Sequence, residues 1–112
     1  MSKRIKKLND LIRDEIGKIL LREFSVPEGI LVTVAYAVVS PTLEHATIYI
    51  SVLPETKSKE ILKKLKLQIF DVQQSLNKIL VMRPVPKIRF EIDTTEAQAS
   101  HIEEILQKVK EK

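Results

Sequence analysis

Residues 30–53, ILVTVAYAVVSPTLEHATIYISVL, hold two apolar stretches on either side of a turn. In the first stretch the alternating positions are Val32, Val34, Tyr36 and Val38. In the second, one face carries Ala46, Ile48, Ile50 and Val52, and the other carries Thr47, Tyr49 and Ser51. Alternation with a period of two predicts strands that bury one face. Ser40-Pro41-Thr42-Leu43 supplies the turn, so we expect an antiparallel hairpin.

Helical periodicity surrounds this hairpin. Residues 3–24 repeat apolar residues at steps of three and four, and so do residues 57–67 and 68–82. Residues 87–93 form a further strand, with Ile88, Phe90 and Ile92 pointing inward. A capping-box pattern at residues 95–98 begins a last helix. The five prolines lie between these segments, which supports the segmentation.

The predicted order is α-β-β-α-α-β-α, which is an α+β fold in a single domain, residues 1–112. Polar residues on one face of the second and third strands predict a sheet that helices cover on one side only. The middle helical pair is long enough to join parallel strands. We therefore expect a three-stranded mixed sheet in the order 1-2-3, the arrangement of a type II KH-like domain. The GxxG loop that KH domains use to approach single-stranded phosphates is missing.

Charge is unevenly distributed along the chain, whose net charge is +4. Residues 1–24 hold seven Lys/Arg and four acids, and residues 56–90 hold nine Lys/Arg and two acids. Residues 25–55 and 91–112 are each net acidic. This asymmetry indicates a polyanionic partner on one side, and we expect the first helix and the middle pair to merge into one basic surface. Lys-rich helices can also serve solubility alone.

Several function classes are disfavoured. There is no cysteine, so disulfides and thiolate metal sites are excluded, and His45 and His101 lie in no catalytic or zinc-binding pattern. Acids such as Asp71, Glu91 and Asp93 are isolated, which speaks against a metal-dependent nuclease. We expect no enzyme activity and no cofactor, metal or small-molecule substrate. The N-terminus shows no signal peptide and no run spans a bilayer, so we expect a soluble cytoplasmic protein and no membrane partner.

The sequence resembles the ribosome-binding factor A family over nearly its whole length. The resemblance rests on Val32-Thr33-Val34, on Val38-Val39-Ser40-Pro41, on Ile48-Tyr49-Ile50-Ser51, and on residues 80–86 followed by Ile88, Phe90 and Asp93. Arg4-Ile5 with Leu11-Ile12-Arg13, and residues 102–106, match the family's first and last helices. The resemblance implies a factor that binds the immature small ribosomal subunit, assists maturation of small-subunit rRNA, and matters most in the cold.

The leading hypothesis is accordingly a monomer that binds rRNA through phosphate contacts. The expected contacts are Lys3, Arg4, Lys6, Lys7, Arg13, Lys57, Lys63, Lys64, Lys66, Lys78 and Arg83. Tyr49 and Arg89 lie on the predicted open sheet face, where Tyr49 is expected to pack across strands. The alternative is a protein-interaction module that docks a basic partner through the acidic last helix.

The middle helices depart from the family at Phe70. Members carry a small Ala-x-Gly kink between these helices, whereas this chain has Gln68-Ile69-Phe70. A large side chain does not allow the close backbone approach that glycine allows. We therefore expect either that Phe70 packs against a neighbouring helix or that the bend lies at another residue.

Overall fold

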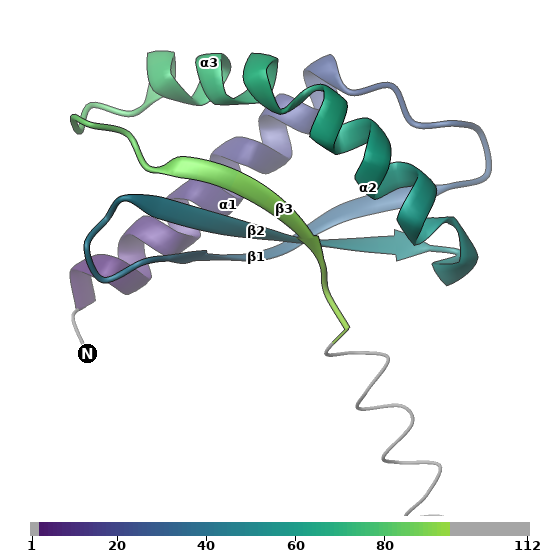
Figure 1. Ribbon diagram of the computed structural model, residues 1–112, viewed down its shortest axis with the longest axis horizontal. Coiled ribbons are helices and arrows are strands. Elements are labelled where there is room, and N and C mark those ends of the chain that lie inside the picture. The colour runs from purple at the N-terminus through teal and green to yellow at the C-terminus, as the bar shows by residue number, and fades with distance from the viewer. Residues whose placement is uncertain (1–2, 95–112) are drawn as a thin grey trace, which may run out of the picture.

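The computed structural model describes residues 3–94 (Figure 1). The elements follow in the order α1 (Lys3–Glu23), β1 (Leu31–Val39), β2 (His45–Leu53), η1 (Glu55–Lys57), α2 (Ser58–Leu67), α3 (Ile69–Ile79) and β3 (Lys87–Ile92). The predicted last helix, with the docking function suggested for it, falls outside the described residues. The α+β class and the order of the other elements are confirmed.

The three strands form one mixed sheet in the predicted order β1-β2-β3. β1 and β2 pair antiparallel, and β2 and β3 pair parallel, with Ile48 opposite Phe90. Ser40 organises the hairpin turn: its hydroxyl oxygen accepts hydrogen bonds from the backbone N–H groups of Glu44 (3.2 Å) and His45 (3.1 Å). A short polar side chain that accepts from backbone N–H groups a few residues further along the chain favours a turn over a continued strand.

A β-bulge interrupts the regular alternation of β1. Val34 lies opposite Ile50 and Tyr36 lies opposite Tyr49, so Ala35 is an extra residue without a partner in the register. A bulge reverses the faces of the residues beyond it. Val32 and Val34 therefore share a side with the core, whereas Tyr36 and Val38 point to the open face of the sheet. The simple alternation that we expected through all four positions is wrong at this point.

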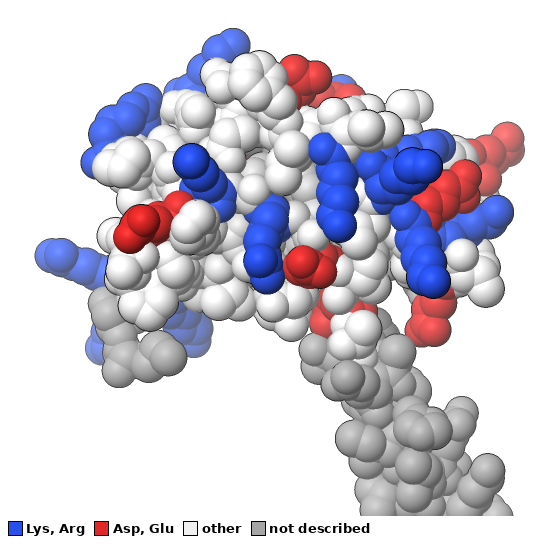
Figure 2. All heavy atoms as spheres, viewed as in Figure 1, with Lys and Arg blue, Asp and Glu red and all other residues white. Residues whose placement is uncertain are grey.

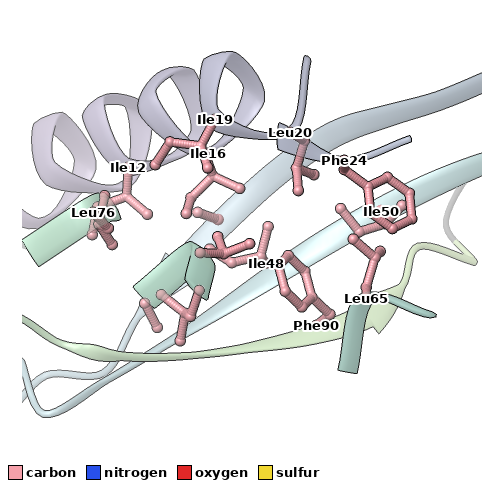
Figure 3. Close-up of a cluster of buried hydrophobic side chains, with 14 of the residues drawn as sticks. Ile12, Ile16, Ile19, Leu20, Phe24, Ile48, Ile50, Leu65, Leu76 and Phe90 are labelled. Carbon is pink, nitrogen blue, oxygen red and sulfur yellow. The ribbon is translucent and has the colours of Figure 1, made fainter. Parts of the chain in front are cut away.

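The core lies between the sheet and the three helices, all of which cover the same face (Figures 1 and 3). Ile12 and Ile16 of α1, Ile48 and Ile50 of β2, and Phe90 of β3 are almost fully buried. Burial of each such side chain contributes roughly 1.5–3 kcal/mol. Within residues 3–94 every buried side chain is apolar. The predicted inward faces of β2 and β3 are confirmed.

Polar side chains anchor α1 and α3 to the sheet. The Asn9 side-chain oxygen accepts a hydrogen bond from the Val39 backbone N–H (2.8 Å), which ties α1 to the end of β1. The Gln73 side chain accepts from the Ile88 N–H (2.8 Å) and donates to the Pro86 carbonyl (3.0 Å), which ties α3 to β3. These bonds satisfy half-buried backbone groups that would otherwise cost free energy. α1 and α3 are thus held by hydrogen bonds as well as by the core, whereas α2 is held by its buried Ile61 and Leu65.

The junction between α2 and α3 is a single residue, Gln68. Phe70 follows it on α3 and is 70% exposed, so the expectation that Phe70 packs against a neighbouring helix is wrong. The alternative expectation, a bend at another residue, agrees with the break at Gln68. α3 then ends at Ile79, three residues earlier than expected, because Leu80 is already extended and the chain turns toward Arg83 and Pro84.

Candidate nucleic-acid interface

Three lysines of α2 lie in a row on the side that faces away from the sheet. Ile61 and Leu65 are fully buried and define the inward side of this helix. Lys59, Lys63 and Lys66 are separated by four and three residues, which places them near one another on the opposite side. All three are exposed, and within residues 3–94 none forms an ion pair. We call these three residues the α2 lysine row.

The α2 lysine row differs in one residue from the contacts expected on this helix. Lys59 was not among them, although its spacing to Lys63 and Lys66 is visible in the sequence. Lys64 was among them, but it lies on the flank of α2 and is half-buried. The position of each lysine around the helix, relative to the buried Ile61 and Leu65, distinguishes the outward Lys59 from the flanking Lys64. The number of lysines in the segment does not make this distinction.

A second basic group lies at the beginning of α1. Lys3, Arg4, Lys6 and Lys7 are all exposed there. Lys78 lies near the end of α3, also exposed, and this helix end is on the same side of the view as the beginning of α1 (Figure 1). Lys3, Lys6, Lys7 and Lys78 form no ion pair with another residue of the described range. Their charges are therefore available to a polyanion.

Two of the expected contact residues are paired with acids of their own segment. Arg13 lies 3.7 Å from a carboxylate oxygen of Asp10 and 3.1 Å from one of Asp14. Lys57 lies 3.8 Å from a carboxylate oxygen of Glu60. A nearby carboxylate weakens the field that such a cation offers to a phosphate. These two residues are weaker candidates than the α2 lysine row.

Arg83 caps the end of α3. Its Nη1 donates hydrogen bonds to the carbonyl oxygens of Leu80 (2.6 Å) and Met82 (2.7 Å), and its Nη2 donates to that of Asn77 (3.0 Å). A guanidinium here supplies donors to carbonyls that have no partner within the helix, and its charge complements the negative end of the helix dipole. The structure thus gives Arg83 a role in the fold, with fewer donors left for a phosphate.

The exposed lysines at the beginning of α1 and those of α2 lie apart, whereas we expected the two helices to merge their charges into one basic surface. The beginning of α1 and the whole of α2 lie toward opposite ends of the view in Figure 1. Figure 2 shows Lys and Arg at both ends and between them, with Asp and Glu interspersed. Helices on one side of a sheet need not bring their charges together, because α1 has 21 residues and is about 30 Å long.

The open face of the sheet carries an aromatic pair. The rings of Tyr36 and Tyr49 stack with their centroids 4.5 Å apart and an interplanar angle of 19°. The predicted cross-strand packing of Tyr49 is confirmed. Arg89 lies on the same face of β3, where its Nη2 is 3.9 Å from a carboxylate oxygen of Glu91. Both candidate side chains of this face therefore have a partner within the fold.

Other kinds of site find little support in the described part of the chain. Residues 3–94 contain no group of three His, Asp or Glu side chains placed to hold a metal ion. None of the helices in that range has the length and apolar character needed to cross a bilayer. A groove of about 730 Å³ lies between α1 and β1, and its lining includes Leu20, Phe24 and Val32. This lining is mainly apolar and offers no cluster of catalytic groups.

Comparison with known proteins identifies the family. The model of the family described as ribosome-binding factor A matches residues 4–106 of the 112-residue chain. The chain belongs to the ribosome-binding factor A family. Ribosome-binding factor A of Chlamydia caviae is 32% identical over 113 aligned residues, which cover 98% of this chain and 94% of that protein. The recognition based on the sequence blocks is therefore confirmed.

Solved structures support the same fold. The crystal structure of ribosome-binding factor A from Thermus thermophilus superposes with a TM-score of 0.67 at 16% identity, over 79% of this chain and 93% of that one. Coordinates of the Thermus thermophilus factor that were fitted into the electron-microscopy map of its complex with the 30S subunit superpose with a TM-score of 0.63 at 16% identity. They cover 76% of this chain and 90% of the fitted one.

Proposed function

We propose that this protein is an RNA-binding ribosome assembly factor that binds the immature small ribosomal subunit and assists maturation of its rRNA. The observation that carries the proposal is the family match over residues 4–106. A second support is that the Thermus thermophilus relative has been fitted into the map of a complex with the 30S subunit. Cytoplasmic location and a monomeric state belong to the same proposal.

The chemistry of the interface favours recognition of the rRNA backbone. Exposed lysines on rigid helices bind phosphates as point charges, which sets register and orientation without reading bases. The α2 lysine row and the exposed lysines at the beginning of α1 lie on two helices that the same core holds in place. Two basic groups at a fixed separation can select a folded RNA by the spacing of its phosphates. Action by binding agrees with the family name, ribosome-binding factor A.

Binding to small-subunit rRNA transcribed in vitro is expected to weaken steeply with salt. Seven exposed lysines offer phosphate contacts: Lys3, Lys6, Lys7, Lys59, Lys63, Lys66 and Lys78. Each contact releases condensed counterions, so a plot of log affinity against log salt concentration should have a slope of about −5 to −6. Filter binding over a series of salt concentrations measures this slope. A slope near zero, together with particle binding that survives nuclease treatment, would instead indicate a protein partner.

A further inference from the structure

The junction between α2 and α3 is short, because Gln68 alone separates the two helices. The backbone N–H of Gln68 donates to the carbonyl oxygens of Lys64 (3.3 Å) and Leu65 (3.1 Å), and its own carbonyl accepts from the Val72 N–H (3.1 Å). Helical hydrogen bonding is therefore present on both sides of this one residue. The last residues of α2 are consequently close to the first residues of α3.

Two large apolar side chains are exposed on this outward side. Leu67 is 78% exposed and Phe70 is 70% exposed, while Val72 and Leu76 of α3 carry the buried contacts. Nothing in the described fold accounts for an aromatic ring in water at this position. A partner that covers it would remove that apolar surface from water, which is favourable.

The ring is next to the α2 lysine row in the chain. Phe70 follows Lys66 by four residues, just beyond the junction at Gln68, so the exposed ring at the beginning of α3 is close to the lysine at the end of the row. The acid next to Phe70 in sequence, Asp71, projects about 100° away around α3. An exposed ring beside a row of cations is the combination that proteins use for unpaired nucleotides, in which the ring stacks on a base and the cations hold phosphates.

We propose that Phe70, with Leu67 beside it, is a stacking platform for an unpaired nucleotide whose neighbouring phosphates bind the α2 lysine row. This inference rests on the proposed RNA-binding function and names the chemistry of one contact within it. Every base has a π-face, so the platform does not need a particular base. The lysines favour this occupant over an apolar protein surface, because burying their charges against such a surface would be costly.

The absence of tryptophan from the chain allows a direct test. The variant Phe70→Trp places one fluorophore on the platform, and single-stranded oligo(A) is the probe. Stacking should quench its fluorescence and keep or raise the affinity. Phe70→Leu, which stays apolar but loses the ring, should bind oligo(A) roughly 5- to 150-fold more weakly. The control Leu21→Trp, on α1 at a residue that is 89% exposed, should show no comparable quenching.

An abasic oligonucleotide with the same backbone separates stacking from charge. It should bind wild type and Phe70→Leu equally, because only phosphate contacts remain. If Phe70→Leu binds oligo(A) as wild type does, the platform is refuted. If Phe70→Leu weakens binding to immature subunits but not to oligo(A), Phe70 contacts a ribosomal protein and the proposal is again wrong. Wild-type protein that binds neither rRNA nor immature subunits would instead refute the proposed function itself.

Discussion

Reversing the α2 lysine row to glutamate should lower the affinity for immature small subunits by about 100-fold or more. Each exposed charge contact contributes up to about 1 kcal/mol, and three of them correspond to roughly two orders of magnitude. Reversal adds repulsion from the phosphates to this loss. The salt dependence should also become shallower, by about 0.7–0.9 in the log–log slope for each lost contact. The measurement is a binding titration of Lys59→Glu/Lys63→Glu/Lys66→Glu at several salt concentrations.

A matched variant separates this site from net charge. Lys18, Arg22 and Arg89 are exposed, and each is within 4 Å of a carboxylate, so reversing them changes the net charge by the same amount away from α2. The control is expected to keep most of its affinity. Circular dichroism should show both variants folded, because the altered side chains lie on the surface. Equal loss of binding in the two variants would refute the assignment of the α2 lysine row.

Truncation of Phe90 is expected to have the largest effect on folding. Phe90 is 1% exposed in the middle of β3, opposite Ile48, and its ring lies among the core side chains of Figure 3. Removing a buried Phe side chain costs about 3–5 kcal/mol, since burial is lost and a cavity remains. Domains of this size are stable by about 5–15 kcal/mol. Phe90→Ala should therefore melt more than about 12 °C below wild type, measured by thermal unfolding.

The same substitution at Phe70 is the matched control. Phe70 is 70% exposed, so Phe70→Ala should change the free energy of unfolding by no more than about 0.5 kcal/mol. The two phenylalanines thus separate a folding role from a binding role. Comparable destabilisation by both substitutions would contradict the exposed position of Phe70, and with it the stacking platform.

Much of the fold could be predicted from sequence because its pattern is local. Ala46, Ile48, Ile50 and Val52 alternate with polar residues, and all four are buried as that alternation predicts. The bulge at Ala35 could not be predicted in the same way, because the residues on both sides of it are apolar. Only pairing with β2 shows that Val34 and Tyr36 face opposite sides. Tertiary pairing decides such positions where local hydrophobicity does not.

The candidate site was predictable in part. Composition indicated which segments are basic, and helical spacing could have placed Lys59 in line with Lys63 and Lys66. The use of Arg83 as a helix cap depends on carbonyl groups that become unpaired only where α3 ends. The exposure of Phe70 depends on the turn at Gln68, which ends α2 and sets the direction in which α3 begins. The capping role of Arg83 and the exposure of Phe70 both follow from backbone geometry, which cannot be predicted from the number and spacing of residue types.

Sedimentation of the wild-type protein with small ribosomal subunits tests the central claim most directly. Immature and mature subunits are run separately on sucrose gradients, each at a low and a high salt concentration. We expect the protein to travel with immature subunits at low salt, to bind mature subunits less, and to be released from both at high salt. Protein that stays at the top of the gradient with immature subunits at both salt concentrations would contradict the proposed function.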